Sequence, residues 1–131
     1  MSSLEALCLV DHDGNAFYWH LPPNRSAGGI PDSKALWDVI WENRERFAGF
    51  AHSHPGRGVP QASIEDLTTF QAIEAGLGRR CKWWITSGTN LFVVMQEWHE
   101  PAPIWISYAH SGSDPSWLAE LRRVSYDTDA L

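Results

Sequence analysis

The pattern of apolar and polar residues along the chain predicts strands and helices in alternation. Leu4 to Val10 is an almost continuous apolar segment, which is typical of a strand covered on both faces. After a turn, Ala16 to Leu21 predicts the return strand. A loop rich in Pro and Gly follows, and Asp32 or Ser33 then caps a predicted helix that runs to about Arg46. The chain is therefore expected to begin with a strand pair and a helix that packs on the sheet.

The rest of the chain continues the alternation and ends with a helix. Phe47 to Ser53 predicts a third strand, and a second helix begins at Ser63 with an apolar stripe that continues to Leu77. Three further strands are expected over Cys81 to Ser87, Asn90 to Gln96 and Ile104 to Ala109. A last helix is expected to begin with Asp114 as its cap and Pro115 in its first turn. This order predicts an α/β or α+β fold in which helices flank one mixed β-sheet.

The size and composition of the chain predict one domain and argue against two classes of binding protein. A chain of 131 residues with 44% apolar and 20% charged residues matches a single globular domain over residues 1–131. The net charge of −6 argues against a general binder of nucleic acids or anionic membranes, because such binding depends on Lys and Arg that neutralise phosphate. The nearest thing to a basic cluster, Arg79-Arg80-Cys81-Lys82, is too short to change this expectation.

The apolar pattern predicts neither a membrane span nor a secretion signal. No segment approaches the roughly 20 apolar residues that cross a bilayer, and no basic start precedes an apolar N-terminal run. We therefore expect a soluble, cytoplasmic protein. Cys8 and Cys81 are expected to be buried free thiols, since two cysteines make no disulfide framework in a domain of this size. They would pair only if the strands that carry them are neighbours.

Two histidines, His52 and His54, stand one residue apart at the end of the third predicted strand. Side chains two positions apart on a strand project from the same face, so the two imidazoles are expected together while Ser53 points away. Two neutral imidazoles on one rigid face form half of a zinc site, and a catalytic zinc needs one more protein ligand and an open position. Asp66 would supply a carboxylate if the Pro/Gly loop turns the next helix back over the strand end.

Ser63 and Asp66 also have a purely structural interpretation. Ser-x-x-Asp before an apolar run is a variant of the capping box, in which each residue satisfies a backbone N–H of the other. A carboxylate in the first turn of a helix also offsets the partial positive charge of the helix N-terminus. Capping and metal binding by Asp66 are therefore compatible in part, although one oxygen cannot serve both fully.

The segment His52-Ser53-His54-Pro55-Gly56, followed by Ser63-Ile64-Glu65-Asp66, resembles the signature of the JAMM (MPN-domain) metalloprotease family, in its free-standing prokaryotic type. Characterised members cleave isopeptide or peptide bonds at the C terminus of ubiquitin or ubiquitin-like proteins. The resemblance covers roughly residues 4 to 97. It implies that His52, His54 and Asp66 bind Zn²⁺ and that Ser63 helps to hold the developing oxyanion. The interval between His54 and Ser63 is one residue longer than most members show.

The resemblance also implies an upstream glutamate that acts as general base, and we assign this role to Glu5. Glu5 stands at the head of the first apolar strand and matches the family's glutamate followed by an apolar strand. A carboxylate at the head of a doubly covered strand is costly unless it has a partner or a task. Glu42 and Glu45 lie opposite or near the edge of the apolar stripe of their helix, so both are expected to be surface charges.

The resemblance implies a zinc peptidase that acts on a ubiquitin-like or sulfur-carrier-like protein. An extended substrate tail would add as a strand beside the histidine-bearing strand, and Arg57 would contact its carboxylate or carbonyl unless it only faces solvent. Two alternatives stay open: a catalytically silent interaction scaffold on the same fold, and a zinc amidohydrolase that acts on small molecules. Zinc deaminases are a poor match, because their signature needs His-x-Glu and a later Pro-Cys-x-x-Cys. The sequence predicts neither the oligomeric state nor a partner subunit.

The remaining imidazole and indole side chains are expected to have structural roles. Most of the eight tryptophans fall where elements should meet, which predicts core packing of the following set: Trp37, Trp41, Trp83, Trp84, Trp98, Trp105 and Trp117. The other histidines lie in turns or at strand ends and are expected on the surface: His12, His20, His99 and His110.

Overall fold

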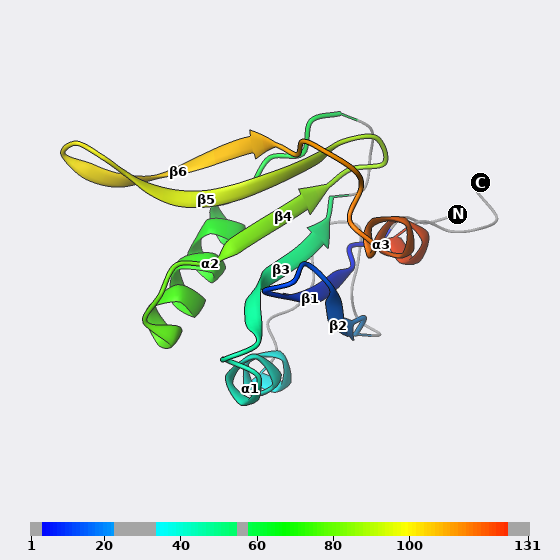
Figure 1. The fold of residues 1–131 in the computed structure, drawn as a ribbon, viewed down its shortest axis with the longest axis horizontal. Helices are drawn as coiled ribbons and strands as arrows, with labels where there is room; N and C mark the ends of the chain where they lie inside the picture. Colours follow the sequence, from blue (N-terminus) through cyan, green and yellow to red (C-terminus); the bar gives the residue numbers. More distant parts are fainter. Residues whose placement is uncertain (1–3, 23–33, 55–57, 126–131) are drawn as a thin grey trace.

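A computed structural model of the chain describes residues 4–22, 34–54 and 58–125 (Figure 1). In this part of the chain the strands are β1 (Leu7–Asp11), β2 (Ala16–His20), β3 (Phe47–Ser53), β4 (Lys82–Thr86), β5 (Leu91–His99) and β6 (Ala102–Ala109). The helices are α1 (Lys34–Glu42), α2 (Ile64–Leu77) and α3 (Leu118–Ser125). None of the described helices is long and apolar enough to cross a membrane.

The strands form one mixed sheet, so the predicted fold class is confirmed. Their order across the sheet is β2-β1-β3-β4-β5-β6. Strands β3 and β4 are parallel, because α2 connects them, and all other neighbouring pairs are antiparallel. The central position of β3 places its C-terminal end, with the two histidines, between β1 and β4.

Helices cover both faces of the sheet, and the alternation of side chains along β1 shows this directly. Leu7 and Leu9 belong to the larger apolar cluster, which includes residues of α1 and α2. Cys8 and Val10 belong to the second cluster, which α3 completes. Figure 1 shows α3 apart from the other two helices. The continuous apolar sequence of this strand therefore arises because both of its faces are buried, as predicted.

Several predicted element boundaries differ from the observed ones. Helix α1 ends at Glu42 rather than near Arg46, and the turn that follows begins at Asn43, whose side-chain Nδ2 donates to the Val39 carbonyl oxygen at 2.8 Å. Helix α3 begins at Leu118 and is not capped by Asp114, since a separate turn precedes it. The predicted caps Asp32 and Ser33 lie outside the described residues.

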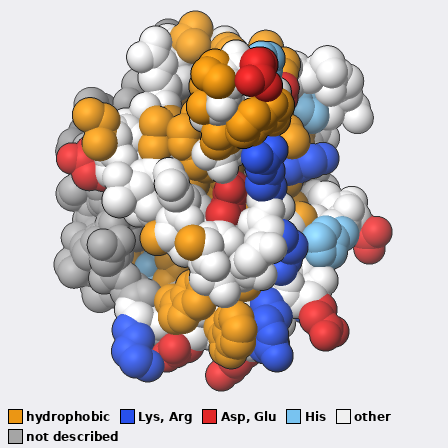
Figure 2. Space-filling view, turned by 90° about the vertical axis from the view of Figure 1, so that its left-hand side faces the viewer, with side chains coloured by type: hydrophobic (Ala, Val, Ile, Leu, Met, Phe, Trp, Pro, Cys, Tyr) orange, Lys and Arg blue, Asp and Glu red, His pale blue; other side chains and the backbone are white. Residues whose placement is uncertain are grey.

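Core packing is confirmed for some of the tryptophans and wrong for two of them. Trp83 is fully buried and stacks on Phe70 of α2, with ring centroids 4.5 Å apart. Trp41 is 44% exposed, and Trp98 is 57% exposed. Trp98 lies on the β5–β6 hairpin, which extends past α2 in Figure 1. Figure 2 looks at this end of the molecule, and hydrophobic side chains gather at the top of that view.

Both cysteines are buried free thiols, as expected. Cys8 lies on β1 and Cys81 immediately precedes β4, and β3 lies between these strands in the sheet. The condition for pairing, that the two strands are neighbours, is therefore not met.

The two thiols should react slowly with alkylating reagents in the native protein. Burial raises the pKa of Cys8 to about 12 and the pKa of Cys81 to about 11. Because the thiolate is the reactive form, labelling at pH 8 should be more than about 100-fold slower in the native protein than in denatured protein. Mass spectrometry of iodoacetamide-treated samples measures both rates. Equal rates in the two states would contradict the burial of these thiols.

Candidate metal centre

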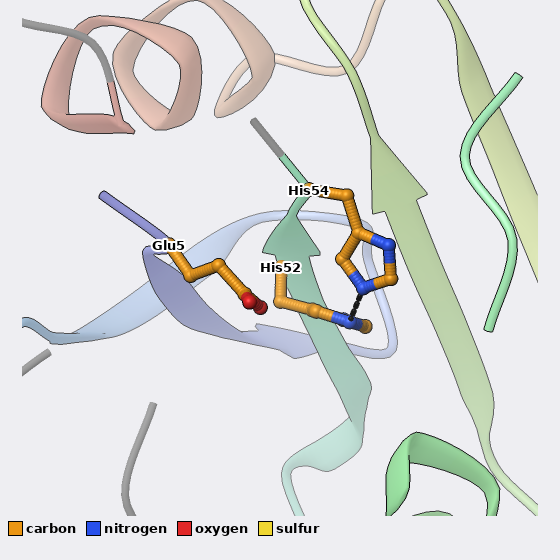
Figure 3. Close-up of side chains that lie close together, drawn as sticks. All are labelled: Glu5, His52 and His54. Atoms are coloured by element: carbon orange, nitrogen blue, oxygen red, sulfur yellow. Dashed lines mark hydrogen bonds between the residues drawn. The ribbon is translucent and has the colours of Figure 1, made fainter. Parts of the chain in front are cut away.

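Four ionisable side chains converge where β1 and α2 begin and β3 ends. One ligand atom from each of Glu5, His52 and His54 lies within 4.8 Å of the others. Figure 3 shows the Glu5 carboxylate pointing toward the two imidazoles from the segment that leads into β1. Asp66, in the first turn of α2, brings its Oδ1 atom within 3.4 Å of His52 Nε2 and its Oδ2 atom within 3.0 Å of His54 Nε2. The sequence-predicted ligands and the predicted base thus lie in one cluster.

The register of β1 and β3 explains why Glu5 and the histidines meet. Leu7 pairs with His52 in the antiparallel ladder. Since side chains alternate along a strand, Glu5 projects on the same side as Leu7, and His54 on the same side as His52. The two imidazoles lie together, as their spacing predicts, with their Nε2 atoms 3.0 Å apart. The neighbouring β1 adds the carboxylate to the same face of the sheet.

The start of α2 brings Asp66 to this cluster and forms the predicted capping box. Asp66 N–H donates to Ser63 Oγ at 3.0 Å, and Ser63 N–H donates to Asp66 Oδ2 at 2.9 Å. Oδ2 thus serves the cap, while Oδ1 is the oxygen nearer His52. The Ser63 hydroxyl accepts in the cap, so its own proton is available to donate. Asp66 thus caps α2 and contacts both imidazoles at once, with Oδ2 shared between the Ser63 N–H and His54.

The distances among these donor atoms fit a single small divalent cation. Atoms that bind zinc at about 2.0–2.1 Å in tetrahedral geometry lie about 3.4 Å from one another. The three contacts that join His52, His54 and Asp66 measure 3.0, 3.4 and 3.0 Å. Two imidazole nitrogens and a carboxylate oxygen are a donor set that zinc prefers. The two imidazoles could therefore hold a metal ion together with a carboxylate, either that of Asp66 or that of Glu5.

Burial and charge set the protonation of the two imidazoles in different ways. Burial lowers the pKa of His52, which is only 3% exposed, and so favours the neutral form that binds metals. Burial also acts to lower the pKa of His54, but the hydrogen bond and charge of Asp66 outweigh it, and the pKa is raised. The Asp66 carboxylate is therefore the main electrostatic partner of the more accessible histidine.

The two carboxyl groups of the centre have pKa values that shift in opposite directions. Burial acts to raise the pKa of Asp66, but hydrogen bonds from His52 and His54 hold it well below its usual range. Burial raises the pKa of Glu5 to about 7, with smaller opposing effects from the charges of His54 and Asp66. Asp66 is thus ionised at neutral pH, while Glu5 gains or loses a proton near neutrality. Such divergence is typical of carboxylates with different tasks in one site.

The ring of His52 is held rigidly by aromatic neighbours. It packs edge-on against Phe50 on its own strand and Phe70 of α2, with centroids 5.7 and 6.0 Å away. Its Nδ1 atom is buried beside the backbone of Trp84, without a hydrogen bond of good geometry. Packing rather than a strong hydrogen bond therefore fixes the direction in which Nε2 points.

The structure corrects two predictions, the site of substrate-strand addition and the surface position of His20, and a third prediction concerns a residue outside the described part of the chain. Strand β3 is paired on both sides, with β1 and with β4, so a substrate tail cannot add as a strand beside it. His20 is not a surface residue: it is 7% exposed, because its pairing with Leu7 turns it toward the α1–α2 face. Its Nε2 atom is buried and finds no hydrogen-bond partner among the described residues, and burial lowers its pKa. Arg57 lies outside the described residues.

The predicted surface positions of several charged and histidine residues are confirmed, whereas the contacts of Ser53 were not predicted. Glu42 and Glu45 are exposed, as are His12 and His99. Ser53, between His52 and His54, is predicted only to point away from the two imidazoles. It is buried, and its Oγ accepts a hydrogen bond from the Ala6 N–H at 2.9 Å. The alternation of β3 indicates that Ser53 points to the opposite face, but no sequence pattern identifies its partners.

A scan of the chain against protein-family models finds no match, and a search of curated proteins finds no significant relative. The interpretation of the centre therefore depends on its own geometry and on the motif that its residues form.

Proposed function

We propose that this chain is a zinc-dependent hydrolase of the JAMM type. It would cleave an isopeptide or peptide bond at the C terminus of a ubiquitin-like or sulfur-carrier-like protein. The observation that carries the proposal is the convergence of Glu5, His52, His54 and Asp66 at one point of the sheet. The resemblance of His52-Ser53-His54-Pro55-Gly56 and of Ser63 to Asp66 to the JAMM signature supports the class of substrate.

His52, His54 and Asp66 are the proposed zinc ligands. Asp66 is preferred to Glu5 as the third ligand, because its oxygens lie within 3.0 and 3.4 Å of the imidazole nitrogens. Its low pKa also keeps it ionised, as a ligand must be. When bound, zinc supplies a Lewis acid that polarises a carbonyl group and makes water acidic enough to ionise near neutral pH.

Glu5 and Ser63 perform the other tasks of hydrolysis in this proposal. Glu5 accepts a proton from water and later delivers it to the leaving amine, and its pKa of about 7 suits both transfers. Ser63 Oγ accepts a hydrogen bond in the cap of α2, and a hydroxyl that accepts can also donate, here to the oxyanion that develops on the substrate carbonyl. Such a reaction needs no covalent bond between enzyme and substrate.

A scaffold without catalytic activity is a poorer explanation of the same residues. The hydrogen bonds among His52, His54 and Asp66 offset part of the cost of placing ionisable groups together, but they do not explain why a fourth such group, Glu5, lies beside them. At this centre Glu5 and His52 are buried, whereas the side chains of His54 and Asp66 are 25% and 19% exposed. The centre thus combines a desolvated interior with an open side, which suits a hydrolase of either proteins or small amides.

The purified protein should bind about one zinc ion per chain. Binding to the folded state alone should raise the free energy of unfolding by about 2.7 kcal/mol when free zinc is 100 times its dissociation constant. Removal of zinc by a chelator should therefore lower the melting temperature by several degrees, and zinc should restore it. Elemental analysis and scanning calorimetry measure these effects. A protein that retains no zinc and shows no shift would contradict the proposal.

The substrate class needs a separate experiment. The zinc-loaded protein is incubated with fusions in which a ubiquitin-like or sulfur-carrier-like protein precedes a short peptide, and with small aryl amides. Cleavage after the C terminus of the protein module, abolished by chelation, is the expected result. Cleavage of the aryl amides alone would favour the small-molecule amidohydrolase instead.

A further inference from the structure

We propose that α3 positions the metal centre from the opposite face of the sheet, through contacts made by Ser125 and Arg122. This inference rests on the proposed metal-dependent function and concerns residues beyond the part of the chain that resembles the JAMM family. Neither residue reaches the zinc ligands directly. Each holds a segment of backbone from which those ligands or the general base project.

Ser125 connects the end of α3 to the strand segment between the two histidines. Its Oγ lies 2.6 Å from Ser53 Oγ and 2.5 Å from the Leu121 carbonyl oxygen. Ser53 Oγ also accepts from the Ala6 N–H at 2.9 Å. A consistent set of protons has Ser125 donating to Leu121 and Ser53 donating to Ser125. Both hydroxyl groups are buried, so protein groups rather than water must satisfy their hydrogen bonds.

Ser125 and Ser53 hold the backbone on the two sides of Glu5. The Ser125 carbonyl accepts from the Leu4 N–H at 2.7 Å, and Ser53 accepts from Ala6. Glu5 lies between these two anchored peptide groups and just ahead of the first residue of β1. Without them, the head of this strand would keep fewer hydrogen bonds to its neighbours. Ser125 therefore acts on the general base and on the histidine pair together.

Arg122 acts on a second segment, the turn between β4 and β5. Its Nε and Nη2 atoms donate to the carbonyl oxygens of Ser87 and Asn90, at 3.1 and 3.4 Å. Within that turn, Ser87 Oγ and Asn90 Nδ2 both donate to the carbonyl oxygen of Gly58, at 2.7 and 2.9 Å. Gly58 begins the described segment that leads to Ser63 and α2. The guanidinium thus supports the turn that holds the entry to the helix of Asp66.

These polar contacts are separable from the docking of α3 itself. Trp117, Leu118 and Leu121 are buried in the second apolar cluster, against Cys8 and other side chains of the sheet. Apolar burial of this kind keeps the helix in place when a polar contact is lost. Loss of the polar contacts should therefore loosen the ligand-bearing segments while the helix stays docked.

The test compares Ser125→Ala and Arg122→Gln with the wild type and with Arg123→Gln. Arg123 is the matched control, because it neighbours Arg122 on α3 and pairs only with Glu120 on the surface among the described residues. Zinc affinity is measured by competition with a chromophoric chelator. The visible spectrum of the Co²⁺-substituted protein reports the arrangement of ligands. Hydrogen exchange of the zinc-free proteins reports the segments around residues 4–7 and 52–58.

We expect zinc affinity to fall by up to about 10-fold in Ser125→Ala and in Arg122→Gln, the lower end of the effect for residues that contact metal ligands directly. Their Co²⁺ spectra should change, and Arg123→Gln should match the wild type in both. In Ser125→Ala, exchange should quicken at Ala6 and around Ser53, because the Ser53 hydroxyl loses its partner, whereas Leu4 keeps its bond to the backbone carbonyl of residue 125. In Arg122→Gln, exchange should quicken near Gly58. Amides of α2 beyond its first turn should exchange at the wild-type rate. A general loss of stability would instead increase the exchange rate there as well.

Two results would overturn the inference. The first is wild-type zinc affinity and an unchanged Co²⁺ spectrum in both variants. The second is uniform faster exchange over the whole sheet, since this indicates a structural role alone. If the wild type binds no zinc, the proposed function fails, but the exchange experiment still decides whether Ser125 and Arg122 hold these segments. Failure of the inference and failure of the function are therefore distinguishable.

Discussion

Replacement of Glu5 by glutamine should abolish most of the hydrolytic activity and leave zinc binding intact. A general base contributes about 10²- to 10⁴-fold to a rate, and glutamine keeps the shape of the side chain but cannot accept the proton. Because His52, His54 and Asp66 remain, the variant should still bind about one zinc ion. Cleavage of the substrate fusion and elemental analysis of the same sample measure the two effects.

Glu42→Gln is the matched control for this variant. Glu42 is an exposed residue at the end of α1, so its replacement removes the same charge without any change at the centre. Its activity should equal that of the wild type. Loss of activity in both variants would indicate an effect of net charge rather than of a general base.

The pH dependence of cleavage gives a further signature of Glu5. A base acts when it is deprotonated, so the rate should rise with pH as Glu5 loses its proton. Burial raises the Glu5 pKa to about 7, and the positive charge of a bound metal acts to lower it. The rising limb should therefore lie at or below neutral pH. Glu5→Gln should lack this limb, and an unchanged profile would mean that another group limits the acidic side.

The sequence predicts those features of the site that depend on local periodicity. The spacing of His52 and His54 is a property of one strand, and Phe47 to Ser53 matches the observed β3. The capping box depends on a four-residue pattern, and the structure contains both of its hydrogen bonds. In each case the information lies within a few residues, where backbone geometry leaves little choice.

Features that depend on contacts between distant segments could not be predicted in this way. Ser53 and Ser125 are 72 positions apart, and serine is a residue type that is common on protein surfaces. Periodicity indicates which face a side chain occupies, but it does not identify the residue that meets it there. The burial of His20 likewise follows from its register with Leu7, which no pattern within β2 contains.

The assignment of Glu5 as general base depends partly on a local pattern and partly on a contact between distant segments. Its position before an apolar strand predicted burial, and its carboxylate is buried and lies beside the histidines. That proximity, however, arises from the pairing of β1 with β3, which strand patterns alone do not establish. The same proximity makes Glu5 an alternative third ligand, so ligand and base must be separated by experiment.

Asp66→Asn should remove zinc binding while α2 keeps its cap. The amide oxygen of asparagine can still accept from the Ser63 N–H, but it is a weaker ligand for zinc than a carboxylate. We expect zinc affinity to fall more than about 100-fold, since loss of a ligand costs more than loss of an orienting residue. The free energy of unfolding of the zinc-free variant should fall by about 1 to 2 kcal/mol, because contacts with the imidazoles and with the helix dipole are lost.

Glu65→Gln controls for the dipole, because Glu65 is an exposed carboxylate in the same first turn of α2. It should bind zinc as the wild type does, so the difference between the two variants isolates the contact with the histidines. Wild-type affinity in Asp66→Asn would mean that Glu5 completes the ligand set. In that case Glu5→Gln must lose zinc, and the general base must be another group. The two variants together therefore decide which carboxylate binds the metal and which transfers the proton.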